Sequence, residues 1–213
     1  LGGRDYRPKS RRYVAIKRAR GGGGERMTYA LLFSGQASQH PDMLPWLESE
    51  PACAETLRLM RERLGPDWRV VLQNPQRRSQ NQFAQVLMTG TALAAWAALK
   101  DRLSTPPAVV AGYSVGELPA FACAGVFTTA QALALATERA SFMDQAVVGL
   151  TTGLLSVSGL SEADVLAACA ELHLECAIRV NAMQSIVAGT DDALLQAASV
   201  LQATGAVCKR LEV

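Results

Sequence analysis

The sequence is poor in histidine and has no closely spaced pair of cysteines. Its two histidines are His40 and His173, and none of its five cysteines forms a Cys-x-x-Cys motif. Zinc sites need such ligands at short spacing, and disulfide scaffolds need paired cysteines, so neither class fits this chain. We expect reduced thiols in a cytoplasmic protein. The cysteines are Cys53, Cys123, Cys169, Cys176 and Cys208.

Long apolar segments are also missing. The longest uncharged apolar stretch in the middle of the chain, residues 86–99, is too short and too rich in Ala and Thr to cross a bilayer, so no membrane segment is expected. Of the 213 residues, 49% are hydrophobic and 19% are charged. This composition has enough apolar content for a packed core, which excludes a disordered or collagen-like chain.

The positive charge lies at one end of the chain. Residues 1–26 carry nine Lys or Arg and two acidic residues, Asp5 and Glu25, which gives this segment a net charge of +7. Because the net charge of the whole chain is +2, residues 27–213 have a net charge of −5. A nucleic-acid-binding protein needs basic residues on its folded part, so no nucleic-acid partner is expected. The four glycines 21–24 and the lack of an apolar leader predict a flexible basic tail, with the natural protein starting at Met27.

From Met27 onward, short apolar runs alternate with helical segments, which predicts an α/β protein. We expect two regions, an α/β core over 27–148 and a smaller subdomain over 149–213. In the core, strands are predicted over 29–34 and 108–111, and helices over 51–64, 83–103 and 129–146.

The smaller region has the element order β-α-β-β-α-β, which is typical of a ferredoxin-like unit. Its apolar runs and helix signals predict strands over 151–157, 177–180, 185–187 and 206–211, and helices over 161–172 and 191–204.

A candidate nucleophile follows the predicted strand 108–111. The string GYSVG, residues 112–116, comes after a strand and opens a helix, which is the context of a nucleophile elbow. In so sharp a turn a Cβ at either glycine would clash, and N–H groups at a helix start stabilise negative charge. A serine at a helix start is often only an N-cap. The glycines and the strand favour Ser114 as nucleophile, with the Val115 N–H as an oxyanion donor.

These motifs resemble the malonyl-CoA:acyl carrier protein transacylase family. GYSVGE (112–117) and FSGQASQ (33–39) are similar to the family patterns GHSxGE and PGQGSQ, and the resemblance runs from Met27 to Val213. It implies a parallel-sheet acyltransferase core with a nucleophile elbow plus a ferredoxin-like small subdomain. Tyr113, in place of the usual histidine, resembles the malonate decarboxylase acyltransferase (epsilon) subunit branch. Further matches follow in the family's order: AQV at 84–86, ER at 138–139, NAMQ at 181–184 and IVAG at 186–189.

The resemblance implies a role for each matching residue. Ser114 would carry the acyl group, and the backbone N–H of Gln36 would be the second oxyanion donor. Arg139 would bind the malonyl carboxylate in a bidentate manner, with Gln85 helping to orient that side. The alternatives are that Arg139 is an ordinary surface residue and that Gln85 is an exposed residue at a helix start. Because the elbow is present, the site role is favoured for Arg139, while both interpretations of Gln85 stay open.

The implied reaction moves a malonyl group from coenzyme A to an acyl carrier protein, in fatty acid biosynthesis or in malonate decarboxylase. The partners are the coenzyme A thioester and the carrier protein, whose phosphopantetheine supplies the accepting thiol. The enzyme needs no metal and no cofactor of its own.

Two departures from the family stand out. Its general base is a histidine in a VSxPFHS-like segment after the small subdomain, and these 213 residues stop short of it; His40 and His173 do not match that pattern. General-base assistance contributes about 10²–10⁴ in rate. We therefore expect a C-terminally truncated chain, and the alternative is an impaired domain that only binds coenzyme A or carrier protein. In addition, Ala37 replaces a family glycine.

An esterase of the α/β-hydrolase class would share the G-x-S-x-G string. That class needs an acid and then a histidine after the serine. Only His173 follows Ser114, and it lies inside the predicted ferredoxin-like region. The sequence therefore favours an acyltransferase over an esterase.

Overall fold

The computed structural model describes residues 29–36 and 38–211. The predicted tail over 1–26, its expected start at Met27 and the substitution at Ala37 lie outside the described residues. The chain divides into two compact units, the first ending at Arg139 and the second covering Ala140–Val213. This division falls inside a helix, α6 (Thr129–Ala146), ahead of the expected boundary at residue 148. Within the described part of the chain, no helix is long and apolar enough to span a membrane.

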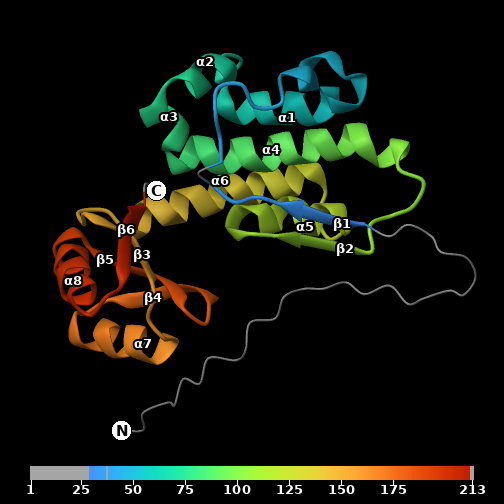
Figure 1. The fold of residues 1–213 in the computed structure, drawn as a ribbon. Coiled ribbons are helices and arrows are strands. Elements are labelled where there is room, and N and C mark those ends of the chain that lie inside the picture. The colour runs from blue at the N-terminus through green and yellow to red at the C-terminus, as the bar shows by residue number, and fades with distance from the viewer. Residues whose placement is uncertain (1–28, 37, 212–213) are drawn as a thin grey trace, which may run out of the picture. The chain divides into compact units, whose positions relative to one another are not determined.

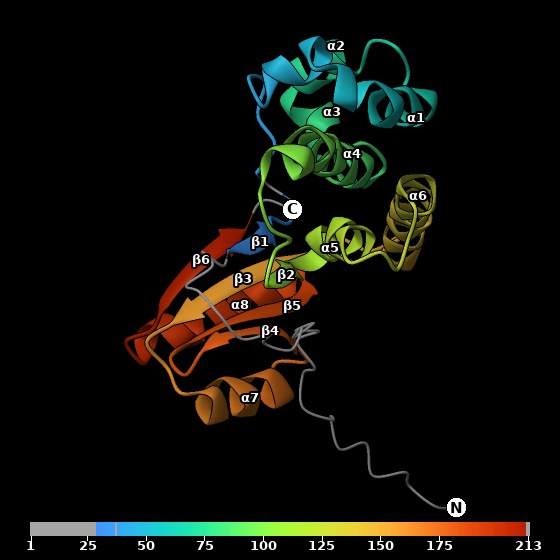
Figure 2. The ribbon, with the colours of Figure 1, turned by 90° about the vertical axis from the view of Figure 1, so that its right-hand side faces the viewer.

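The first unit contains a parallel pair of strands. β1 (Ala30–Phe33) pairs with β2 (Val109–Gly112) in a register that places Ala30 beside Val109 and Phe33 beside Gly112. Figures 1 and 2 show the two strands side by side, with α5 (Glu117–Cys123) against them. The parallel pairing confirms the α/β class, and it places the ends of both strands at the same edge of the sheet.

Helices make up most of the rest of the first unit. The helix predicted over 83–103 corresponds to α4 (Asn81–Leu99), which is followed by a 3-10 turn, η3 (Lys100–Arg102). The helix predicted over 51–64 corresponds to a 3-10 turn, η2 (Pro51–Cys53), which continues into α1 (Ala54–Leu64). Gly65 ends α1 with φ 87°, a conformation that glycine adopts without strain. Three shorter elements were not predicted from the sequence: η1 (Pro45–Ser49), α2 (Trp68–Gln73) and α3 (Pro75–Ser79).

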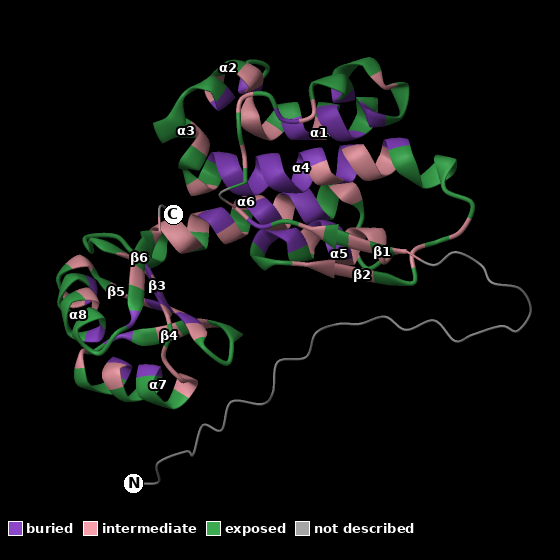
Figure 3. Cartoon of the chain, in the orientation of Figure 1, coloured by how far each residue is buried: buried purple, intermediate pink, exposed green. Residues whose placement is uncertain are grey.

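α4 forms the centre of this unit. It is apolar around most of its circumference, and its residues from Phe83 to Thr91 are all buried, as Figure 3 shows. α1 packs closely on it because Gly90 leaves room for Met60: a Cβ on Gly90 would lie 2.6 Å from the Met60 sulfur. Trp68 and Leu72 of α2 belong to the same apolar core. α4 is therefore a fixed support for any polar side chain it carries.

Arg69 of α2 ties the segment before α1 to the core. Its guanidinium donates to the Met43 and Leu44 carbonyls at 2.6 and 2.9 Å, and to both carboxylate oxygens of Glu48 at 2.9 and 3.0 Å. It also lies over the Trp68 ring, 4.1 Å from the centroid. The Arg69 hydrogen bond lowers the pKa of the Glu48 carboxyl.

The second unit has the ferredoxin-like topology expected for it. β3 (Thr152–Ser158), β4 (Glu175–Asn181), β5 (Gln184–Thr190) and β6 (Val207–Leu211) form an antiparallel sheet in the order β4-β5-β3-β6. The helices α7 (Glu162–Glu171) and α8 (Asp191–Ala203) pack on one face, through a core shared by both helices and the sheet. Ser161 and Thr190 cap them by accepting from the N–H three residues on, a pattern typical of helix starts.

Glu48→Gln tests the ion pair with Arg69. Because the pair lowers the Glu48 pKa, its contribution to stability is present above the usual pKa of a glutamate and is lost as the pH falls through the lowered value. We expect a loss of about 0.5–1 kcal/mol near neutral pH and almost none at about pH 3, measured by urea unfolding. Asp101→Asn, which removes the same charge from an exposed side chain, is the control. An equal loss at both pH values would contradict the assignment.

Candidate active site

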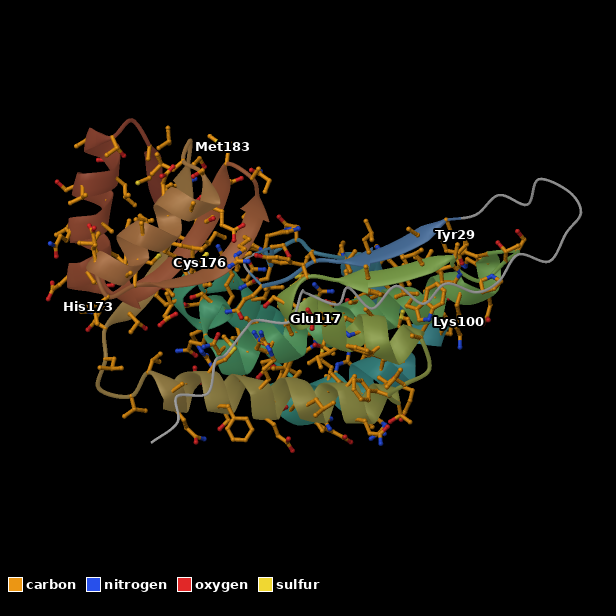
Figure 4. The ribbon with its side chains drawn as sticks, turned by 90° about the horizontal axis from the view of Figure 1, so that it is seen from below. Tyr29, Lys100, Glu117, His173, Cys176 and Met183 are labelled. Atoms are coloured by element: carbon orange, nitrogen blue, oxygen red, sulfur yellow. The ribbon has the colours of Figure 1, made fainter. Side chains whose placement is uncertain are left out.

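A strained turn joins β2 to α5. After the strand, Ser114 adopts φ 55°, in the left-handed region that residues other than glycine rarely occupy, and it begins the 3-10 helix η4 (Ser114–Gly116) that leads into α5. Ser114 is exposed. This is the strand, turn and helix of a nucleophile elbow, with the serine at its apex. Glu117, labelled in Figure 4, is the first residue of α5.

The two glycines of the elbow are required by close backbone approach. A Cβ on Gly112 would overlap the Gly116 carbonyl, and a Cβ on Gly116 would lie 2.5 Å from the carbonyl oxygen of Phe33. The predicted clash at both glycines is confirmed. A third glycine, Gly35, lies in the turn after β1, where a Cβ would come within 2.9 Å of the Tyr113 carbonyl oxygen. The β1 turn and the elbow therefore pack backbone to backbone.

Arg139 lies beside the candidate nucleophile. It is carried by α6, and one guanidinium amino group donates to Ser114 Oγ at 3.2 Å. The other amino group donates to the side-chain oxygen of Gln85. Among the residues that the structure describes, Arg139 is the hydrogen-bond partner of the Ser114 hydroxyl. The structure thus brings together a serine, an arginine and a glutamine from three separate segments.

Gln85 is fully buried, so it is not the exposed residue at a helix start that the alternative required. Its amide nitrogen donates to the side-chain oxygen of Gln36, in the turn after Gly35. Gln36 in turn donates to Asn81 Oδ1 at 3.0 Å and to the Ser79 carbonyl at 3.4 Å. Both hydrogen-bonding ends of the buried Gln85 amide are satisfied.

The two backbone groups predicted as oxyanion donors lie in this region. Val115 is the buried second residue of η4, where a backbone N–H has no carbonyl partner inside the helix. Gln36 lies in the turn that packs on the elbow through Gly35. Their roles as donors stay a prediction.

The two histidines lie in loops. His40 is exposed in the segment after β1, and in the described part of the chain no hydrogen bond joins its ring to Ser114. His173, labelled in Figure 4, is exposed in the turn between α7 and β4, with φ 53°. Within the first unit, His40 is therefore not joined to Ser114 as a base, and His173 belongs to the second unit.

Cys123, at the end of α5, is the cysteine on the elbow helix. Burial raises the pKa of its thiol to about 12. A thiol is nucleophilic as its thiolate, so Cys123 stays protonated and unreactive at neutral pH. All five cysteines are free thiols, as expected.

The site includes residues that the sequence analysis did not single out. Asn81 and the Ser79 carbonyl complete the hydrogen bonding of Gln36. Asn81 is the first residue of α4, a position where a polar side chain is ordinary, and it belongs to none of the motifs that pointed to the other residues.

Parallel strands, an exposed serine on an elbow and an arginine in contact with it are the arrangement expected of an α/β protein that uses a serine nucleophile on an anionic substrate. Comparison with known proteins agrees with this class. Residues 30–213 match the family described as "Acyl transferase domain", and the chain belongs to that family.

Relatives with a more specific name cover most of this chain. The "Malonyl CoA-acyl carrier protein transacylase" of Salmonella typhimurium is 31% identical over 185 residues, which are 84% of this chain and 60% of the relative. The solved structure of the corresponding Coxiella burnetii protein matches with a TM-score of 0.79 at 28% identity, over 87% of this chain and 61% of that one. The chain therefore spans about 60% of the length of these relatives.

A second similar structure contains a partner. It is a "type II PKS acyl-carrier protein in complex with its malonyl-transacylase", which matches with a TM-score of 0.79 at 25% identity, over 88% of this chain and 63% of that one.

Replacing Ser114 tests the strain at the elbow. Ala and Gly both lack the hydroxyl, so their difference isolates the cost of the left-handed backbone. We expect Ser114→Gly to be more stable than Ser114→Ala by about 0.5–1 kcal/mol, because a Cβ is unfavourable at positive φ. The measurement is the free energy of unfolding in urea.

Ser199, an exposed residue inside α8, provides the matched control. There the order should reverse, with Gly less stable than Ala by about 1 kcal/mol, because glycine is unfavourable inside a helix. A Ser114→Gly variant that is less stable than Ser114→Ala, as at the control position, would show that the elbow is not strained.

Proposed function

We propose that this chain is the acyltransferase part of an enzyme that moves a malonyl group from coenzyme A to an acyl carrier protein through an acyl-serine. The observation that carries the proposal is the Arg139 guanidinium, 3.2 Å from an exposed elbow serine. A cation at that distance can bind a carboxylate on the acyl chain while Ser114 attacks the carbonyl of the same chain.

The first half-reaction forms the acyl-enzyme. Ser114 Oγ attacks the thioester carbonyl, whose oxygen becomes an oxyanion stabilised by the N–H groups of Val115 and Gln36. The tetrahedral intermediate collapses, the carbon–sulfur bond breaks and coenzyme A leaves as its thiolate. The serine proton passes to a general base. Arg139 has no acceptor and cannot be that base. In the family that this sequence resembles, a histidine after the small subdomain supplies it.

The second half-reaction runs the same steps with a different thiol. The phosphopantetheine thiol of the carrier protein attacks the ester carbonyl at Ser114, the same oxyanion donors stabilise the intermediate, and the serine alkoxide leaves and takes back a proton. Both half-reactions use one site, so the thiol that enters must occupy the place that coenzyme A has left.

Selectivity for malonyl comes from Arg139 and Gln85. The guanidinium fork matches the two oxygens of a carboxylate, and a neutral acetyl group would leave that charge without a substrate partner. Gln85 holds one amino group of the guanidinium from a fully buried position, which supports its predicted orienting role.

The partners and the compartment belong to the same proposal. The coenzyme A thioester and the carrier protein supply both thiols, so the enzyme needs no resident cofactor or metal. The similar malonyl-transacylase in complex with an acyl-carrier protein supports a carrier partner. Five free thiols suit the cytoplasm. The malonate decarboxylase branch, predicted from Tyr113, stays a prediction, because the relatives described above carry the transacylase name.

Malonyl-CoA should leave a covalent malonyl adduct on Ser114. We expect a malonyl mass increase that survives denaturation and maps by peptide mass spectrometry to Ser114, because the elbow exposes this hydroxyl. Ser114→Ala should not be labelled, whereas Cys123→Ser should be labelled like the parent, because the Cys123 thiol is protonated. Binding of malonyl-CoA without any adduct would instead favour the impaired, binding-only domain.

Arg139→Ala should change which acyl group is transferred. Malonylation of Ser114 should fall by roughly 10²-fold or more, since a charge-assisted pair is lost, while acetylation from acetyl-CoA should be kept or raised. The rates of adduct formation from the two thioesters give the ratio. Arg61→Ala, which removes an exposed arginine of α1, should leave the ratio unchanged. An equal loss for both acyl groups would assign Arg139 a structural role.

A further inference from the structure

Four side chains form a single directed series of hydrogen bonds. Arg139 Nη1 donates to Gln85 Oε1, Gln85 Nε2 donates to Gln36 Oε1, and Gln36 Nε2 donates to Asn81 Oδ1 at 3.0 Å. In this series each amide N–H points away from the guanidinium, and each amide oxygen points toward it. We call this series the amide chain; it runs from the arginine beside the nucleophile to the first residue of α4.

The direction of the amide chain is imposed by its charged end. A guanidinium has only donors, so Gln85 must present its oxygen to Arg139, and its nitrogen must then find an acceptor. Gln36 can accept only if its own nitrogen points away, and Asn81 Oδ1 receives that nitrogen. Aligned amide dipoles strengthen one another and stabilise the cation, most of all where the group is buried, as Gln85 is.

Gln36 belongs to the amide chain and to the oxyanion turn at once. Its side chain joins Gln85 to Asn81, while its backbone lies in the turn after Gly35 that packs on the elbow. Gln39 adds a second attachment of the same segment, because its amide donates to the Arg78 carbonyl of α3 at 3.1 Å. Gln85, which orients the arginine, is therefore hydrogen-bonded to the residue whose backbone N–H would stabilise the oxyanion.

We propose that Asn81 is a positioning residue for the acyl transfer: as the acceptor of the Gln36 amide, it fixes Gln36 and Gln85 and, through them, the guanidinium that selects a carboxylated acyl group. This inference rests on the proposed function. The bond that Asn81 makes in this series is with Gln36, so it acts on the guanidinium through Gln36 and Gln85. The Ser79 carbonyl, at 3.4 Å from Gln36 Nε2, is the longer and weaker of the two acceptors.

The experiment compares three variants at the start of α4. Asn81→Ala removes the acceptor, Asn81→Asp keeps an acceptor oxygen in the same place, and Gln80→Ala changes the exposed neighbouring side chain as the control. For each variant, the rates of Ser114 acylation by malonyl-CoA and by acetyl-CoA are measured over a range of concentrations, together with the midpoint of thermal unfolding.

We expect Asn81→Ala to lower the ratio of malonylation to acetylation rates about three- to tenfold, because one hydrogen bond is lost. The fall should come mainly from weaker apparent binding of malonyl-CoA. Asn81→Asp should restore the ratio, and Gln80→Ala should match the parent. A fall of both rates by the same factor in Asn81→Ala, or an Asn81→Asp variant that behaves like Asn81→Ala, would overturn the inference. Absence of any adduct on the parent would instead contradict the proposed function.

A second measurement does not depend on acylation. In nitrogen-15 NMR spectra, the side-chain signals of Arg139, Gln85 and Gln36 report on the amide chain directly. Asn81→Ala should shift or broaden the Arg139 Nε–H signal, although three hydrogen bonds separate the two residues along the series. Changes limited to Gln36, with Arg139 as in the parent, would overturn the inference even if the enzyme is active.

Discussion

The left-handed backbone of Ser114 is the constraint on which the site depends. A residue with a side chain holds φ 55° only where its surroundings leave no other conformation. Here the surroundings are backbone: the β1 carbonyl at Phe33 lies where a Cβ on Gly116 would be, and the Gly35 turn lies against Tyr113. The candidate nucleophile and the turn that would hold the oxyanion therefore pack directly on each other.

The polar side of the site depends on the apolar packing of α4. Gln85 is held in one orientation because it is fully buried and because both ends of its amide are bonded. A buried amide and a strained serine both reduce stability by themselves. The apolar core around α4, which includes Met60, Trp68 and Leu72, provides the stabilisation that allows a fold to hold such groups in place.

Much of the fold could be predicted from local patterns. The helix over 129–146 and the β-α-β-β-α-β order of the second unit follow from apolar periodicity together with start signals such as Ser161, which are local properties of the chain. The short helices α2 and α3 were missed. Each has six residues or fewer, too few for a periodic pattern. α2 is held by Trp68 and Leu72, which pack into a core made by distant residues, and α3 begins at Pro75 with Asn74 as its cap.

The sequence by itself determined the elbow, because a strand, two glycines at set spacing and a helix start are contiguous, and the approach that requires Gly112 is local, whereas the one that requires Gly116 comes from the distant strand β1. It also pointed to Arg139, Gln85 and Gln36 through their motifs. Only the tertiary structure decided that these side chains join one another and end at Asn81. They come from α6, α4 and the turn after β1. Periodicity shows which face of a helix is buried, whereas the residue it meets there depends on how distant segments pack.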